Sequence, residues 1–255
     1  MRSERFRTDG APSLRVQLSS GEIDLETVDG DETSIELTPL NDGGRQAIEA
    51  AVVELEERRR LLLFRDAKVL LKVTCPHGAQ VELKTVAADV RARGRYAEVD
   101  LKGVSGDMRV DDVEGNARLK TVSGDVRVSS VGGELTVQSV SGDTTAERIG
   151  GAAELRSVSG DVRVGDAGGS VTIQTVSGDQ GVASVTQGAV QLKSVSGDVT
   201  LGIARGSRLW IDAKSVSGDA QSDLDISDSP VDGDEGPLVE VRATALSGDI
   251  TITRG

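Results

Sequence analysis

The sequence predicts an all-β fold, a right-handed parallel β-solenoid of the β-helix or β-roll kind, with about 18 residues and two strands in each coil. Three observations predict it. The word Val-Ser-Gly-Asp recurs along the 255-residue chain, short runs of alternating apolar and polar residues lie between the copies, and glycines stand at regular places between the runs. The right hand follows from the strong preference of parallel strands for right-handed connections.

The repeated word sets the period. Its seven copies begin at Val104, Val122, Val140, Val158, Val176, Val195 and Val216. The first five starts are 18 residues apart, and the last two gaps are 19 and 21 residues. A worn copy begins at Val86, and a last copy, Leu-Ser-Gly-Asp, begins at Leu246. A short fixed period is typical of repeats that stack on their neighbours.

Each coil is expected to contain two strands. In residues 122–139, Val126 and Val128 belong to one alternating run, and Leu135 and Val137 belong to a second. Alternation with a period of two and an abundance of valine are typical of half-buried strands. Glycine turns close each run, so the valines of successive copies are expected to meet inside the coils.

Stacking the copies lines up three inward rows. One row is Leu83, Leu101, Leu119, Val137, Leu155, Ile173, Leu192 and either Ile211 or Ala213. The second is Val110, Val128, Ala146, Val164, Val182 and Leu201. The third is Thr85, Gly103, Thr121, Ser139, Ser157, Thr175, Ser194 and Ser215. Its hydroxyl groups are expected to form hydrogen bonds at the bend, because buried hydroxyls need partners.

We expect one continuous domain in three parts. Residues 1–79 are interpreted as degenerate coils with a capping helix at about 45–60, residues 80–220 as the regular solenoid, and residues 221–255 as a capping hairpin or last coil. The helix is predicted because Ile48, Val52 and Leu55 follow the spacing of one apolar face. It is interpreted as a cap over the end of the solenoid, or alternatively as a helix that docks a partner.

Near the other end, the period is interrupted. Residues 223–238 are rich in Asp, Ser, Pro and Gly and are interpreted as an acidic loop. Leu209 and Ile211 are expected to point inward, which turns Trp210 outward as a possible contact residue. The alternative is that a neighbouring segment covers Trp210.

Composition argues against several classes of partner. The net charge of -13 disfavours nucleic acid and anionic membranes, and an aromatic content of 2% removes the usual platforms for stacking bases. No stretch has the apolar length that spans a bilayer, so membrane insertion is not expected. The first residues contain no leader peptide, which favours the cytoplasm, with association to the cell envelope through a partner as the other option.

No catalytic or cofactor-binding residues are predicted. The chain has one cysteine, Cys75, and one histidine, His77, in the turn that leads into the regular coils. No third group stands beside them to complete a metal site or a nucleophile and base pair. The chain is therefore not expected to be an enzyme or to bind a cofactor.

Stacking also lines up charged residues on the outside. One column contains Asp89, Asp107, Asp125, Asp143, Asp161, Asp179, Asp198 and Asp219. Like charges at strand spacing repel, so either calcium or a second column must offset them. Asp107, Asp125, Asp143, Asp161, Asp179, Asp198 and Asp219 are the calcium candidates. The simpler alternative is that Arg91, Arg109, Arg127 and Arg163, two residues after an aspartate, neutralise the column, and that each aspartate accepts backbone hydrogen bonds at the corner.

A further outer row is largely basic or amide. It contains Lys84, Lys102, Lys120, Gln138, Arg156, Gln174, Lys193 and Lys214. It is interpreted as an ordinary face of mixed charge, or alternatively as a flat surface that binds a ligand or protein.

The coils of the form Ser-Gly-Asp-Val-x-Val, with Gly-x-Leu-x-Val between them, resemble the bacterial putative-adhesin family of β-strand-repeat proteins. The resemblance covers most of the chain and is clearest from Gly78 to Asp219 and from Val241 to Ile250. It implies a right-handed parallel β-solenoid without established catalytic residues, and it implies a place at the cell envelope for many members.

Three functions remain open. The first is a non-enzymatic scaffold or protein-binding module whose partner the sequence does not name. The second is a self-assembling solenoid similar to the cytoskeletal bactofilins. The third is a calcium-stabilised β-roll. A monomer is favoured over a filament, because the predicted helix and the acidic loop resemble end caps.

Overall fold

A computed structural model describes residues 2–7, 10–50, 54–56, 59–223 and 236–254. Contacts within the chain divide it into two compact units, Met1–Val131 and Gly132–Gly255, and each unit is described by itself. Both units consist almost entirely of strands, so the all-β prediction is confirmed at this level. The described residues contain no helix that is long and apolar enough to span a bilayer.

The first unit contains nine strands among its described residues. They are β1 (Arg2–Arg7), β2 (Ser13–Val28), β3 (Glu32–Pro39), β4 (Glu54–Glu56), β5 (Arg59–Pro76), β6 (Ala79–Lys102), β7 (Met108–Val113), β8 (Ala117–Lys120) and β9 (Val126–Val131). The repeat sets their register: Leu101 of β6 pairs with Leu119 of β8, and Val110 of β7 pairs with Val128 of β9, in both cases 18 residues apart and parallel.

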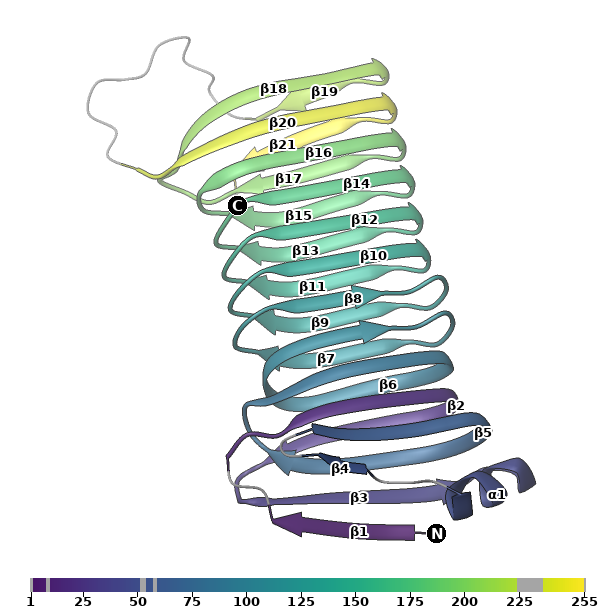
Figure 1. Cartoon of the computed structure of the whole chain (residues 1–255). Helices are drawn as coiled ribbons and strands as arrows, with labels where there is room; N and C mark the ends of the chain where they lie inside the picture. Colours follow the sequence, from purple (N-terminus) through teal and green to yellow (C-terminus); the bar gives the residue numbers. More distant parts are fainter. Residues whose placement is uncertain (1, 8–9, 51–53, 57–58, 224–235, 255) are drawn as a thin grey trace. The chain divides into compact units, whose positions relative to one another are not determined.

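The order of the first strands differs from their order in the sequence. Strand β2 lies between β5 and β6 and is parallel to both (Figure 1). Strand β3 then pairs antiparallel with β5, and β1 pairs antiparallel with β3. The degenerate coils expected in residues 1–79 therefore do not stack in the order of the sequence. Strand β2 fits between β5 and β6 because its Ile23 pairs with Leu71 of β5 and with Val90 of β6, and all three side chains are buried.

The helix is shorter than predicted. Helix α1 covers Asp42–Ala50, with Asn41 as its N-cap: the Asn41 side-chain oxygen accepts a hydrogen bond from Gly44 N–H at 2.6 Å. Residues 54–56 and 59–60, expected in the helix, lie in β4 and β5 instead, and β4 pairs antiparallel with β5. Residues 51–53 and 57–58 of the expected helix lie outside the described residues. Tertiary pairing with β5 overrides the local helical spacing here.

The second unit contains twelve strands among its described residues. They are β10 (Leu135–Ser141), β11 (Thr144–Ile149), β12 (Ala153–Ser159), β13 (Val162–Ala167), β14 (Val171–Ser177), β15 (Gln180–Val185), β16 (Gly188–Ser196), β17 (Val199–Ile203), β18 (Arg208–Ser217), β19 (Ala220–Ser222), β20 (Leu238–Ser247) and β21 (Ile250–Arg254). Even-numbered strands form one parallel sheet and odd-numbered strands form the other.

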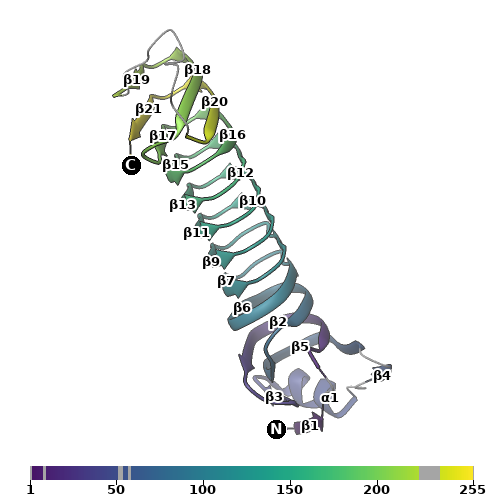
Figure 2. The same cartoon turned by 90° about the vertical axis from the view of Figure 1, so that its left-hand side faces the viewer.

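The last coil of the sequence is not the outermost coil. Strand β20 lies between β16 and β18 and is parallel to both, and β21 lies between β17 and β19 in the same way (Figure 2). Of the two alternatives for residues 221–255, the described strands fit a coil and not a hairpin, because β20 and β21 lie in different sheets, each parallel to its neighbours. Strand β18 comes before β20 in the sequence, but β20 lies between β18 and β16 in the sheet.

The predicted apolar rows lie in the core of each unit. In the second unit, Val137, Leu155, Ile173 and Leu192 pair in succession and are all buried. Ala213, and not Ile211, continues this row through Ala243.

The predicted hydroxyl row is also buried, apart from Ser215, which is half-buried. Thr121 and Ser139 donate to the carbonyl oxygens of Ser123 and Ser141, and Ser215 donates to that of Gly248. These hydroxyls close the bend as expected. Thr85 and Ser157 differ, because their hydroxyl oxygens are buried without a hydrogen-bond partner.

The glycine of the repeated word is required by the backbone. Gly160 has a φ of 123°, a conformation that side chains disfavour. A Cβ atom at Gly160 would lie 2.3 Å from the carbonyl oxygen of Gly142 in the coil before. The corner therefore needs glycine for two reasons: the positive φ of the backbone, and the close approach of the neighbouring coil.

Candidate binding surface

The first valine of the repeated word points outward. In the second unit, this position forms a strip of exposed aliphatic side chains, here called the valine strip: Val140, Val158, Val176, Val195, Leu246 and Val216. Their exposed fractions run from 44% to 76%. The first unit carries the same feature at Val86, Val104 and Val122. Because exposed apolar strips of this kind are unusual on a protein surface, we take the valine strip as a candidate contact site.

A column of basic, amide and hydroxyl side chains borders the valine strip on one side. Two residues before each strip residue stand Gln138, Arg156, Gln174, Lys193, Thr244 and Lys214. Strand register places them side by side: Arg156 pairs with Gln174, Gln174 with Lys193, and Lys193 with Thr244. Because residues two apart in a strand share a face, this column and the valine strip lie on the same sheet face.

The aspartate column borders the other side, around the corner. In the second unit it contains Asp143, Asp161, Asp179, Asp198, Asp249 and Asp219. Oδ1 of each of the first five accepts a hydrogen bond from the backbone N–H of the aspartate in the next coil, at 2.9 to 3.0 Å. In the first unit, Asp89, Asp107 and Asp125 repeat the pattern. The aspartates are thus structural corner residues, with the donor in the neighbouring coil instead of in their own turn.

Arginine occupies the second carboxylate oxygen in some coils. Arg109, Arg127 and Arg163 donate to Oδ2 of Asp107, Asp125 and Asp161, at 3.3, 3.0 and 2.7 Å. These are three of the four arginines proposed to neutralise the column. Arg91 instead lies 3.7 Å from Glu22. After Asp179, Asp198, Asp249 and Asp219 a neutral residue stands in the arginine position, so that end of the column keeps its negative charge.

The calcium candidates lie on successive corners of this column. Within the described ranges, no group of three or more His, Cys, Asp or Glu side chains is placed to hold a metal ion. Asp125 and Asp143 make further interactions besides those given above. Calcium binding by Asp107, Asp125, Asp143, Asp161, Asp179, Asp198 and Asp219 stays a hypothesis.

Trp210 lies on the outermost strand of the second unit, β18. Its side chain is 46% exposed, and the guanidinium carbon of Arg242 lies 5.5 Å from the ring centroid. A cation over an indole face at this distance is an attractive contact. Most of the acidic loop expected to cover Trp210, residues 224–235, lies outside the described residues.

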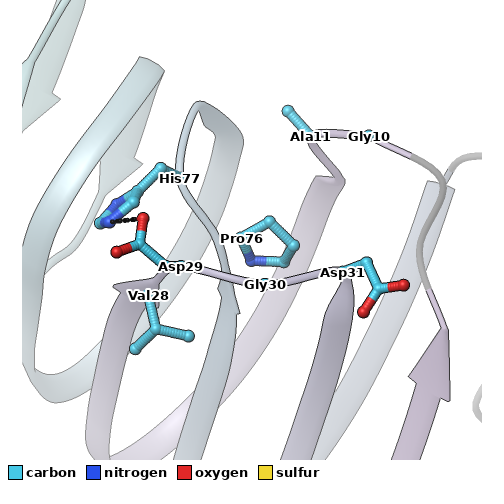
Figure 3. A pocket seen from close by; sticks show the side chains of 8 residues that line it. All are labelled: Gly10, Ala11, Val28, Asp29, Gly30, Asp31, Pro76 and His77. Atoms are coloured by element: carbon cyan, nitrogen blue, oxygen red, sulfur yellow. Dashed lines mark ion pairs between the residues drawn. The ribbon is translucent and has the colours of Figure 1, made fainter.

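A shallow pocket of about 260 Å³ lies in the first unit, around His77 (Figure 3). The His77 Nδ1 atom lies 2.8 Å from Thr27 Oγ1, and its Nε2 atom lies 3.5 Å from the exposed carboxylate of Asp29. Cys75 is fully buried and does not line the pocket. The residues that line this pocket include no nucleophile placed beside a base.

Comparison with protein families decides what the chain is. Residues 7–165 and 150–253 both match the family described as Toastrack DUF4097. The chain belongs to this family. The predicted membership of a putative-adhesin family of unknown function is thereby confirmed, together with a solenoid-like repeat fold.

Solved structures similar to this Toastrack chain are distant in sequence. A putative adhesin from Parabacteroides distasonis is 14% identical, with a TM-score of 0.47, covering 98% of this chain and 96% of the other. A putative adhesin from Bacteroides fragilis is 13% identical, with a TM-score of 0.36, covering 100% and 96%. A putative lipid binding protein from P. distasonis is 11% identical, with a TM-score of 0.42 and the same coverage. No curated protein matches the chain.

Proposed function

We propose that this Toastrack protein is a non-enzymatic scaffold of the putative-adhesin type that presents the valine strip to a protein partner. One observation carries the proposal: six aliphatic side chains are exposed at the same place in six successive coils. Leaving valine in water forgoes the free energy of burial, about 25 cal/mol for each Å² of apolar surface. A partner that covers the strip recovers that free energy.

The rigidity of the second unit supports this role. Backbone hydrogen bonds join each coil to the next. The aspartate column adds a ladder of hydrogen bonds, one from each aspartate to the next at the corner. Side chains held on such a frame lose little conformational freedom when a partner binds. We infer that the coils wind right-handed, with two strands in each, as parallel connections favour.

The charges on the edge strand β1 argue against growth of the protein into a filament. Strand β1 turns Arg2 and Glu4, an ion pair, and Phe6 toward the side that is inward in the apolar strands, while Ser3 and Arg5 are exposed. Inward-pointing charges on an edge strand oppose further strand pairing. A bactofilin-like filament is therefore the weaker alternative. The proposal also includes a location in the cytoplasm.

Capture of partners tests the proposal. Wild-type protein and a variant carrying Val158→Thr, Val176→Thr and Val195→Thr are immobilised and exposed to lysate of the source organism. Threonine keeps the β-branched shape while making the strip polar. A control carries Thr145→Ser and Thr200→Ser, on the other sheet.

Proteins captured by the wild type and the control but lost from the strip variant support the proposal. Equal capture by all three proteins contradicts it.

A further inference from the structure

We propose that the partner of the valine strip is a second copy of this chain, lying alongside the first with both copies pointing in the same direction. The inference rests on the proposed function and names the partner for that same surface. It is carried by the charges on either side of the strip, which are opposite in sign.

The basic side of the strip is strongest toward the end of the second unit. Lys193 and Lys214 are exposed there, two residues before Val195 and Val216. Lys214 already pairs with Asp212, at 2.9 Å between Nζ and Oδ1. An ammonium group has three donors, so this pair leaves Lys214 donors for a second contact.

The acidic side is uncompensated in the same coils. Asp198, Asp249 and Asp219 are exposed, each three residues after a strip residue. None of them has an arginine two residues later, where Arg163 follows Asp161. Asp198 Oδ1 accepts the N–H of Asp249, and Asp249 Oδ1 accepts the N–H of Asp219. In the coils of β16 and β18, the surface therefore runs from lysine through valine, serine and glycine to the aspartate around the corner.

This order of charges selects one of two symmetric arrangements. A two-fold axis along the strip brings the lysine side of one copy opposite the aspartate side of the other, coil by coil. A two-fold axis across the strip instead places lysine opposite lysine and aspartate opposite aspartate. Like charges held opposite each other disfavour an interface, so the parallel arrangement is selected. The strip is then self-complementary, as a two-fold interface must be.

The expected complex is a weak dimer that does not grow further. Six coils at a spacing of about 4.8 Å give a strip roughly 24 Å long between its end residues. A contact of this length and of one strip's width is smaller than the roughly 800 Å² that each partner buries in a standard interface. We therefore expect a dissociation constant in the micromolar range. A two-fold interface uses the valine strip of both copies and closes, so this surface does not add a third copy.

Sedimentation of the full chain tests the pairing. Over a rising concentration series, the mass of the wild type is expected to rise from 26.6 kDa toward twice that value. For the variant with Val158→Thr, Val176→Thr and Val195→Thr, the dissociation constant of the dimer is expected to be at least about tenfold higher, since each lost apolar contact weakens the complex. The control with Thr145→Ser and Thr200→Ser is expected to match the wild type. Circular dichroism of each variant checks that the strands are retained.

Disulfide crosslinking tests the direction. Ser141→Cys and Ser217→Cys place a thiol next to Val140 and Val216, at the two ends of the strip, while the native Cys75 is buried and serves as the background. In the parallel dimer, each variant crosslinks to itself. In the opposite arrangement, neither variant does so alone, and a crosslink forms only when the two are mixed.

The outcomes separate the two proposals. A monomer at every concentration, a dimer unaffected by the strip variant, or a crosslink found only in the mixture overturns the parallel dimer. If the protein is monomeric and the strip variant still loses captured proteins, a different partner uses the strip and the proposed function survives. If neither the mass nor the capture depends on the strip, both proposals fail.

Discussion

Asp198 Oδ1 accepts a hydrogen bond from the backbone N–H of Asp249 at 2.9 Å, although 51 residues separate the two in the sequence. Asp249 in turn accepts the N–H of Asp219, also at 2.9 Å. The ladder therefore runs from Asp198 to Asp249 and then back to Asp219, against the order of the chain. The inserted coil is joined to its neighbours by the same bond that joins consecutive coils.

This bond predicts different effects for two substitutions of Asp198. Asp198→Ala removes the acceptor for the Asp249 N–H and is expected to lower the free energy of unfolding by about 1 kcal/mol. Asp198→Asn keeps an acceptor oxygen and removes a charge between two other aspartates, so its loss is expected to stay below about 0.5 kcal/mol. Urea unfolding measures both. Equal losses for the two variants would show that the ladder bond adds nothing.

Gln180 is a buried polar residue in an apolar row. Its neighbours in the register are Val162 and Val199, and its side-chain oxygen is buried without a hydrogen-bond partner. Its amide nitrogen donates to Thr175 Oγ1 at 2.8 Å and to the Lys193 carbonyl oxygen at 2.7 Å.

Replacement by an apolar residue of strand character removes the unsatisfied oxygen. Gln180→Val is expected to raise the free energy of unfolding by about 1 kcal/mol. Gln174→Val, on the outer face of the adjacent coil, is the control and is expected to stay within about 0.5 kcal/mol of the wild type. A lower unfolding midpoint for Gln180→Val would mean that its two donated hydrogen bonds outweigh the unsatisfied oxygen.

Two glycines of the same unit are expected to differ in their tolerance of a methyl group. Gly160→Ala forces a Cβ against the Gly142 carbonyl oxygen at a positive φ, and a loss of about 2 kcal/mol or more is expected. Gly181 lies in β15 at an ordinary φ, and its nearest neighbour for a Cβ is Arg163 Cγ at 4.0 Å. Gly181→Ala is therefore expected to change stability by less than about 0.5 kcal/mol. Chemical denaturation of both variants checks the contrast.

Glu82 of β6 makes stability depend on pH in the acid range. A hydrogen bond from Lys84, and a further one from Arg15 of β2, hold the pKa of Glu82 below its ordinary value of 4.5, against an opposing effect of burial. The Arg15 Nε atom lies 2.8 Å from Glu82 Oε2.

A pKa that is lower in the folded state gives stability above the ordinary value, and this stability is lost as the pH falls below it. The loss is expected to stay below about 1 kcal/mol, because the pair is partly exposed. Glu82→Gln is expected to flatten this part of the profile between neutral pH and the acid range. A profile identical to that of the wild type would remove Glu82 as its source.

Calcium is expected to leave the protein unchanged. Aspartate oxygens in both units already accept hydrogen bonds from backbone N–H groups or from arginine. The melting temperature should therefore be the same with excess calcium and with excess EDTA. A clear rise with calcium that disappears in the variant Asp179→Asn would establish the β-roll alternative.

The repeated word predicted the register of the regular coils, because it fixes both the spacing and the side of each residue. Val137 over Leu155 and Val110 over Val128 follow directly from the 18-residue period. The hydroxyl row followed as well, because a polar residue in an inward position needs a partner at the bend.

The insertion of β2 and β20 was not predictable from the same pattern. Every copy presents the same apolar row, so local sequence does not specify which copy lies next to which. Leu192 pairs with Ala243, whereas Ala213, which comes earlier in the sequence, pairs with the other side of Ala243. The predicted helix was too long for a related reason. The spacing of Ile48, Val52 and Leu55 describes a helix, but it contains no information on the competing pairing of residues 54–56 with β5.

The valine strip was missed although a signal for it exists. Alternation that turns Ser157 inward must turn Val158 outward, yet a valine in a strand-rich repeat suggests a core residue. The aspartate column was found, but its donor was assigned to the turn itself, because a hydrogen bond between coils depends on the close approach that only the folded backbone provides.

The position of β20 between β16 and β18 has a consequence for the order of synthesis. A ribosome makes the segment that forms β18 before it makes the strand against which that segment packs. Strand β18 therefore lacks its neighbour until residues 238–247 have been made, and a chain cut short before residue 238 leaves β18 without the layer on which it rests.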